Sequence, residues 1–303
     1  MNIEIYYGDT PIRYSTFKFP AGEVQVNIHE DDIHMLDKAI HNVQPLQIVA
    51  RLYSAEDITV LELLNNAVNK LLALPGRFHR VLTLPYLPYA RQDRVCSLGE
   101  AFSLEVMASR INNMKFDVVV LYDPHSEVSS MLISNSCVVP QNEVFKEAEL
   151  LYEDDIESTY DYFCSPEAGA TKKILPLCRE FGKELIEATK ERCVKTGKIV
   201  RTKVHTDQVL EGKSVLIVDA ICHGGRTFIE LAKVLKKDYN VSTVGLYVTH
   251  GIFSKGFDEV LKWIDTVYTT DTYFKLDNPA HEGAMQNEFL QCAELGVYYN
   301  ETI

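Results

Sequence analysis

The stretch VLIVDAICHGGRTFIELAKVL, residues 215–235, decides the fold and indicates a binding site. An apolar strand is expected to end on Asp219, a glycine turn follows at 224–225, and a helix then begins. Such a turn can wrap a phosphate group, because glycines allow close approach and the first N–H groups of a helix point at an anion. Thr227 adds a hydroxyl donor and Arg226 adds positive charge. The competing interpretation is a turn that uses glycine for geometry alone.

The same alternation of strand and helix patterns runs along most of the chain. Apolar runs of strand length alternate with segments of helical period at 46–53, 58–74, 81–89, 103–112 and 117–123. The alternation resumes after an acidic stretch at 147–161. It predicts an α/β protein with two mostly parallel sheets, each flanked by helices. Two sheets in series predict two domains, residues 1–145 and 146–303.

Composition excludes several classes of protein. The chain has 303 residues with 43 acidic and 30 basic side chains, and its net charge of −13 argues against nucleic acid or an anionic membrane as partner. No run of 18 apolar residues is present, so we expect no membrane-spanning helix. The first residues, 1–4, lack the basic and apolar regions of a signal peptide, so we expect no export. Seven cysteines form no C-x-x-C pair, which favours a reduced, cytoplasmic setting.

Three further segments are expected at the carboxyl ends of strands, where ligands of such folds collect. PYLPYARQDR (85–94) offers arginine forks for phosphate and tyrosine rings for a base, although its charges could simply pair on a solvated loop. VVVLYDPHSE (118–127) places His125 where it could ligate a metal or make an ordinary hydrogen bond. CSPEAGA (164–170) brings the carboxylate of Glu167 to a further strand end, although the segment could also be a plain turn without a binding role.

In order along the chain, these segments resemble the ribose-phosphate diphosphokinases, whose domains have the type I phosphoribosyltransferase fold. PYLPYARQDR matches the ATP-binding signature of that family, YDPHSE resembles its metal segment, and CSPEAGA looks like its S-P-D-x-G-G turn. FPAGEVQV (19–26), ATKERC (188–193) and THGIFS (249–254) are similar to its F-S-D-G-E, catalytic-loop and T-H-P-I-F-S segments. The resemblance covers residues 17 to 272.

The resemblance implies roles for particular residues. Lys190 and Arg192 would be catalytic, reaching the transferring phosphates from a mobile loop, and His125 and Glu167 would hold Mg²⁺. ATP would be bound by Phe19, Ala21, Gly22, Glu23, Arg91, Gln92 and Arg94. The sugar phosphate would be bound by Asp219, His223, Gly224, Gly225, Arg226 and Thr227. Family members commonly form homo-oligomers, and we expect the same here.

The sequence also departs from the family pattern. Ala220 and His223 stand where the family has acidic side chains, and Arg226 brings a guanidinium into the phosphate loop. Ala21 replaces an aspartate that would read adenine, and Glu167 replaces an aspartate linked to the metal. The changes therefore gather where the adenine and the far end of the acceptor would be read.

The resemblance implies transfer of the β,γ-diphosphoryl group of ATP to the 1-hydroxyl of ribose 5-phosphate, giving phosphoribosyl diphosphate and AMP. The cationic loop leaves ADP-ribose open as an alternative acceptor, for rebuilding NAD; some viral relatives are thought to use it, so a divergent viral member would fit. A non-catalytic, nucleotide-binding regulatory relative is a second alternative. A phosphoribosyltransferase that moves a base would share the glycine turn but would leave PYLPYARQDR without a role.

Overall fold

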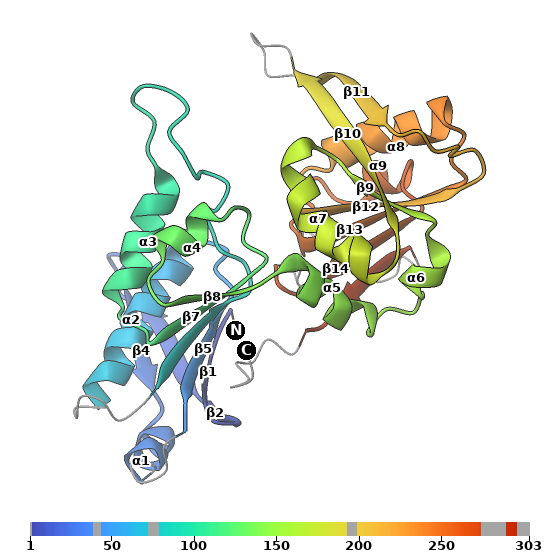
Figure 1. Cartoon of the computed structure of the whole chain (residues 1–303). Helices are drawn as coiled ribbons and strands as arrows, with labels where there is room; N and C mark the ends of the chain where they lie inside the picture. Colours follow the sequence, from blue (N-terminus) through green and yellow to red (C-terminus); the bar gives the residue numbers. More distant parts are fainter. Residues whose placement is uncertain (1, 39–43, 72–78, 193–198, 274–288, 296–303) are drawn as a thin grey trace. The chain divides into compact units, whose positions relative to one another are not determined.

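The chain folds into two compact units that divide between Val139 and Pro140. The computed structural model describes residues 2–38, 44–71, 79–192, 199–273 and 289–295 (Figure 1). The predicted α/β class with two mostly parallel sheets is confirmed. The assignment of ATP to the first unit and of the sugar phosphate to the second stays a prediction. No helix in the described ranges is both long and apolar enough to span a membrane.

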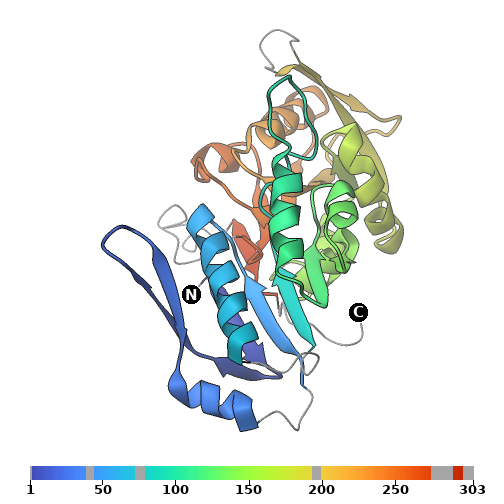
Figure 2. The same cartoon turned by 90° about the vertical axis from the view of Figure 1, so that its left-hand side faces the viewer.

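The first unit is built on a six-stranded sheet of order β2-β1-β5-β6-β7-β8, in which β5 to β8 are parallel and β1 and β2 are antiparallel. A separate hairpin, β3–β4, lies beside α2 (Figure 2). The elements are β1 Ile3–Tyr7, β2 Thr10–Ile12, β3 Tyr14–Lys18, β4 Val24–Ile28, α1 Glu30–Lys38, β5 Leu46–Ala50, α2 Ala55–Leu71, β6 Arg80–Leu84, α3 Ser103–Asn113, β7 Val118–Tyr122, α4 Val128–Leu132 and β8 Ser136–Val139.

The second unit has a seven-stranded sheet of order β11-β10-β9-β12-β13-β14-β15, parallel except for the β10–β11 hairpin. Its last strand, β15, comes from the C-terminal part of the chain. The elements are α5 Gln141–Glu149, α6 Ile156–Thr159, β9 Tyr162–Ser165, α7 Ala168–Glu180, β10 Glu184–Arg192, β11 Ile199–His205, β12 Ser214–Cys222, α8 Arg226–Asp238, β13 Thr243–Gly251, α9 Asp258–Leu261, β14 Thr266–Thr270 and β15 Leu290–Ala293.

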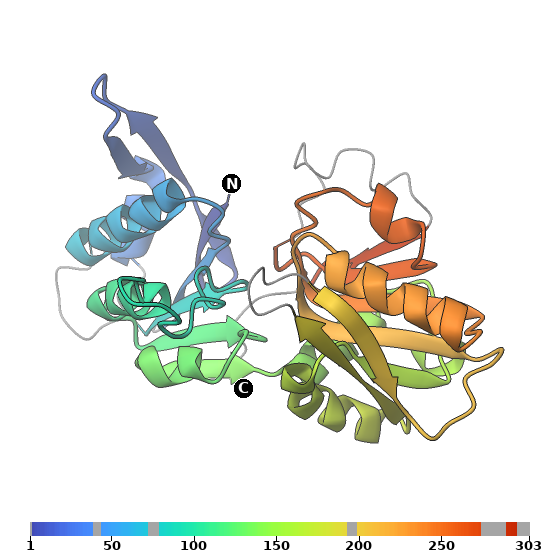
Figure 3. The ribbon, with the colours of Figure 1, turned by 90° about the horizontal axis from the view of Figure 1, so that it is seen from above.

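Both faces of β12 are buried, which explains why this strand reads as a continuous apolar run. Val215 and Ile217 belong to a core cluster with Phe228 of α8. On the other side of the sheet, Phe145 of α5 packs against Tyr247 with 4.5 Å between ring centroids. The helix α7 contacts α5 and lies with it on one face of the sheet, and α8 lies on the opposite face (Figure 3). Each fully buried side chain of this size stabilises the fold by about 1.5–3 kcal/mol.

Two sequence predictions about local structure are wrong, one on where a strand ends and one on whether a segment is a loop. The strand expected to end on Asp219 continues to Cys222, because Ile221 and Cys222 still pair with β13. The segment around Lys190, expected as a mobile loop, is a β-strand over 184–192 that pairs antiparallel with β11. Pairing with β9 on one side and with β11 on the other holds this charged segment in a strand.

A carboxylate fixes the start of β12 against the start of β9. Asp161, immediately before β9, accepts hydrogen bonds from Ser214 N at 2.9 Å and from Lys213 Nζ at 3.2 Å. Its own N–H donates to the carbonyl of Ser214 at 3.0 Å. The hydrogen bonds from Ser214 and the charge of Lys213 lower the pKa of Asp161 below its usual range. The two neighbouring strands are therefore aligned at their first residues.

We predict that Asp161→Asn destabilises the protein at neutral pH. The side chain is 39% exposed, so water weakens its bonds and we expect a loss of about 1 kcal/mol in the free energy of unfolding. Since the pKa of Asp161 is lowered in the folded state, its contribution is present above about pH 4 and is lost as the pH falls through that lowered pKa. Urea unfolding at pH 7 and pH 3 should show the difference shrinking. Asp207→Asn is the matched exposed control, and an equal loss there would contradict the prediction.

Candidate active site

The glycine turn after β12 has the backbone that a phosphate-binding loop needs. Gly225 precedes α8 with φ +71°, a left-handed conformation that L side chains rarely adopt. A Cβ built on Gly225 would also lie 2.7 Å from Cγ2 of Val260. The first N–H groups of α8 have no partner within the helix and point out of its end. His223 and Arg226 are exposed beside the turn, and Thr227 is half-buried.

The loop after β13 supports this turn from behind. The N–H groups of Ile252 and Phe253 donate to the carbonyl of Cys222 at 2.9 and 3.1 Å, and Ser254 N donates to the carbonyl of His223 at 2.9 Å. The THGIFS segment (249–254) and the phosphate turn, which the sequence singles out separately, are thus in direct contact. The backbone of the turn is held before any ligand binds.

Lys255 is a neighbour of this turn that the sequence reasoning missed. A methyl group built on Gly224 would lie 3.6 Å from Cδ and Cε of Lys255, so the lysine stem runs beside the glycine. The residue is exposed, and its position directly after the THGIFS segment is the one sequence signal that could have identified it. Lys255 adds a second cation to Arg226 near the turn.

Asp219 lies three residues before the end of β12, rather than at its end. It is half-buried, and its Oδ1 accepts a hydrogen bond from Ala220 N at 2.7 Å. This position is at the carboxyl half of the strand, where an acceptor for sugar hydroxyls is needed.

Lys190 and Glu167, which the sequence places in different roles, form an ion pair with 2.9 Å between Nζ and Oε2. Glu187 of β10 pairs with Ser165, the last residue of β9, so Lys190 stands beyond the end of β9 where α7 begins. The Lys190 side chain is 6% exposed and that of Glu167 is 47% exposed. The structure therefore brings the predicted catalytic lysine and the predicted metal ligand together.

Arg192 is the last residue of β10, and the register with β11 shifts between Glu191 and Arg192. Its side chain lies outside the described part of the chain. Its predicted catalytic role stays a prediction.

In the first unit, the four residues expected to contact ATP near the N-terminus form the tip of the β3–β4 hairpin. Phe19 N donates to the carbonyl of Glu23 at 2.8 Å, and Gly22 N donates to that of Phe19 at 2.8 Å. Phe19, Ala21, Gly22 and Glu23 are all exposed. The Phe19 ring contacts Phe17 edge to face, with 5.1 Å between centroids. An exposed ring at a hairpin tip could stack on a base.

The other ATP-binding candidates follow β6. Arg91, Gln92 and Arg94 are exposed, and Gln92 is fixed through its N–H, which donates to the carbonyl of Tyr89 at 2.9 Å. Arg94 approaches Asp93 at 3.4 Å, as the surface-pairing interpretation predicts, but Arg94 remains 79% exposed and can reach a ligand.

His125 follows the neighbouring strand β7. It is exposed, and the backbone bends just before it at Asp123, which has φ +36° and donates its N–H to the carbonyl of Val139 at 2.9 Å. Since β6 and β7 are adjacent and parallel, the segments at 91–94 and 125 leave the same edge of the sheet.

The metal prediction can be tested against the donors that the described residues offer. Within those residues no three His, Cys, Asp or Glu side chains gather as a metal site. Mg²⁺ in nucleotide enzymes is commonly held by one or two protein ligands while phosphates and water supply the rest. Single donors such as His125 and Glu167 fit that arrangement, in which the ion arrives with ATP.

Comparison with known proteins supports the resemblance seen in the sequence. No protein-family model matches the chain. It is 28% identical over 260 residues to a ribose-phosphate pyrophosphokinase of Pyrococcus furiosus, covering 84% of each chain. It is also 28% identical over 259 residues to the protein of that name from Sulfurisphaera tokodaii, covering 84% of this chain and 82% of the other.

A solved structure shows the same fold. The phosphoribosylpyrophosphate synthetase of Mycobacterium smegmatis matches with a TM-score of 0.71 at 17% identity, over 93% of this chain and 86% of that one. The predicted family resemblance, the phosphoribosyltransferase-like fold and the prediction of an enzyme are thereby confirmed. The roles of individual residues remain predictions.

We predict that Gly225→Ala disturbs the turn far more than Gly224→Ala. The alanine at 225 must keep a left-handed φ and displace Val260, which should lower the free energy of unfolding by about 2 kcal/mol. Gly224 has no positive φ, and a methyl group there meets only the flexible end of Lys255. Chemical denaturation of the two variants measures the difference. Equal losses would show that the turn does not depend on the conformation of Gly225.

Proposed function

We propose that this chain, a homologue of the ribose-phosphate pyrophosphokinases, transfers the β,γ-diphosphoryl group of ATP to the 1-hydroxyl of ribose 5-phosphate and releases AMP. The oxygen of the 1-hydroxyl would form a bond to the β-phosphorus, the bond from that phosphorus to the oxygen of AMP would break, and the hydroxyl proton would pass to solvent. The names of the relatives support this reaction. The observation that carries it is the pairing of Lys190 with Glu167 at the strand ends.

Lys190 would supply positive charge to the transferring phosphates. Transfer of this kind needs positioning and cations more than covalent help. Because Glu167 is half-exposed, water weakens its pairing with Lys190. A phosphate group with two charges can therefore compete with the carboxylate for the ammonium group. Arg192 would act from the end of the same strand.

The turn at 223–227 would hold the 5-phosphate of the acceptor. Its N–H groups are available at the start of α8, Thr227 can donate a hydroxyl, and Asp219 can accept from the sugar hydroxyls. Mg²⁺ carried by ATP would neutralise charge on the phosphates, and His125 and Glu167 remain the predicted protein ligands, each a single donor of its own unit. The residues expected to bind the rest of ATP are Phe19, Ala21, Gly22, Glu23, Arg91, Gln92 and Arg94.

ADP-ribose remains the second candidate acceptor, and a specific observation favours keeping it. Arg226 is exposed at the turn, and the stem of the exposed Lys255 runs beside Gly224. An acceptor whose 5-phosphate carries a further phosphate would bring extra negative charge past the turn, where these cations could meet it. Ribose 5-phosphate keeps precedence because the glycine turn itself is intact.

We propose that the protein carries out this function in the cytoplasm and as a homo-oligomer. Met131 of α4 is 81% exposed and Val106 of α3 is 59% exposed, so both apolar side chains are available for contact with another copy.

We predict that Lys190→Ala lowers the rate of AMP release from ATP and ribose 5-phosphate by about 10² or more, because charge on the transferring group loses its partner. Lys190→Arg should retain part of the activity. Lys172→Ala, an exposed lysine of α7, is the matched control and should leave the rate unchanged. AMP release by Lys190→Ala at the original rate would show that Lys190 is not catalytic, whereas ATP binding without AMP release by the unaltered protein would support the non-catalytic alternative.

We predict that ribose 5-phosphate has a higher kcat/KM than ADP-ribose when AMP release is measured with each sugar. Arg226→Ala should lower kcat/KM for ADP-ribose about tenfold more than for ribose 5-phosphate. Only ADP-ribose has a second phosphate group, and that group would lose its pairing with Arg226. Arg179→Ala, an exposed arginine on α7, is the control. A far higher kcat/KM for ADP-ribose would reverse the order of the two candidates.

A further inference from the structure

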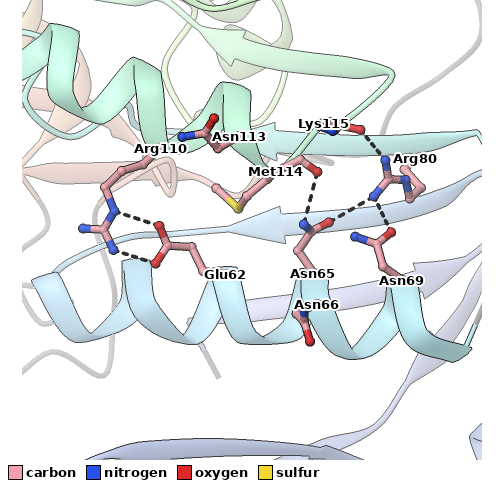
Figure 4. Close-up of a pocket in the computed structure, with 9 residues that line it drawn as sticks. All are labelled: Glu62, Asn65, Asn66, Asn69, Arg80, Arg110, Asn113, Met114 and Lys115. Atoms are coloured by element: carbon pink, nitrogen blue, oxygen red, sulfur yellow. Dashed lines mark hydrogen bonds and ion pairs between the residues drawn. The ribbon is translucent and has the colours of Figure 1, made fainter.

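A pocket of about 570 Å³ lies in the first unit between α2, α3 and the start of β6 (Figure 4). None of the residues proposed for ATP or metal binding lines it. Its lining residues are Glu62, Asn65, Asn66, Asn69, Arg80, Arg110, Asn113, Met114 and Lys115. The volume is within the range of pockets that hold small molecules, about 300–1,000 Å³.

Polar and charged residue types predominate in the lining, although the aliphatic parts of these side chains contribute more of its surface than their polar atoms do. Among the described residues, the lining has four asparagines, two arginines and one lysine against a single acidic residue, Glu62, which pairs with Arg110, and one apolar residue, Met114 (Figure 4). The local balance is therefore cationic in a protein whose net charge is −13. The excess of cationic over anionic side chains favours an anionic ligand, and the amides could bind the hydroxyl groups of such a ligand.

Two arginines are held in place without any ligand. Arg80 donates to the side-chain oxygens of Asn65 at 3.2 Å and Asn69 at 2.5 Å, and to the carbonyl of Lys115. Arg110 makes a two-bond pair with Glu62, at 2.8 and 2.7 Å. These bonds fix the walls of the pocket and hold positive charge there, which reduces the side-chain entropy that the protein loses when a ligand binds.

Other side chains of the pocket are left for a ligand. Lys115, Asn66 and Asn113 are exposed. Lys115 can offer an ammonium group to an oxyanion, and the amides can donate to and accept from hydroxyl groups. The ring of Phe116 beneath the pocket is covered by Arg80, whose guanidinium carbon is 5.7 Å from the ring centroid. No aromatic face of the described lining is therefore offered to a nucleobase.

From this geometry we propose that the pocket binds a small phosphorylated polyol, with the phosphate between Lys115 and Arg80 and the hydroxyl groups against the asparagine amides. The site is separate from the proposed active site and does not depend on the reaction proposed above. A neutral sugar would lack the charged group, and inorganic phosphate would lack the hydroxyls.

The test is calorimetric titration of the full chain with glucose 6-phosphate, with glucose and inorganic phosphate as separate arms. We expect glucose 6-phosphate to bind, glucose not to bind measurably, and phosphate to bind at least about fivefold more weakly. Lys115→Asn and Asn66→Ala should each weaken glucose 6-phosphate about tenfold. Asparagine suits position 115 because the backbone there has φ +55°.

Two controls separate this pocket from other sites. Lys70→Gln changes an exposed lysine on the same helix, α2, outside the pocket and should not affect binding. Thr227→Ala changes the proposed sugar-phosphate turn and should not affect binding either. Loss of binding with Thr227→Ala but not with Lys115→Asn would place the ligand at the turn and overturn the proposal. Equal affinity for phosphate and glucose 6-phosphate would overturn the proposed role of the amides. If glucose 6-phosphate does not bind at all, the proposal that the pocket binds a phosphorylated polyol is wrong.

Discussion

The parallel pairing of β12 with both β9 and β13 is the constraint on which the candidate site of the second unit depends. Parallel neighbours end at the same edge of a sheet, so the segments that follow them must meet there. Glu167 follows β9, the glycine turn follows β12, and the loop that supports the turn follows β13. Side chains more than 80 residues apart in the sequence are thus delivered to one edge by the ladder of backbone hydrogen bonds.

Most of the fold can be read from the sequence because its signals are local. Runs such as 117–123 are apolar over the length of one strand, and 58–74 has the period of a helix, so both elements appear close to their expected places. The sequence predicts too early an end for β12, because the charged Asp219 follows an apolar run and is typical of a residue that ends a strand. What decides that end is pairing of Ile221 with His250, which is a contact between distant segments. The β10 strand is likewise decided by pairing, because the run of charges at 190–192 resembles a surface loop in the sequence and only the contacts with β9 and β11 make it a strand.

The candidate site was predicted in part. The residues themselves could be singled out because their order along the chain resembles a family pattern, but their contacts could not. The sequence assigns Lys190 to the phosphates and Glu167 to the metal, and only the fold reveals that the two are partners. The amide-rich pocket has no signal of its own beyond Asn65, Asn66 and Asn69 on one helix, because its cations come from β6 and from the end of α3.

The burial of Lys190 has a consequence for the chemistry of the resting protein. An amine is acylated or carbamoylated only when an electrophile can reach it, and the side chain of Lys190 is almost fully buried and paired with Glu167. Lysines on the surface, such as Lys172, have no such cover. If Lys190 has the proposed role, the fold shields its amine from electrophiles through burial and through the ion pair with Glu167.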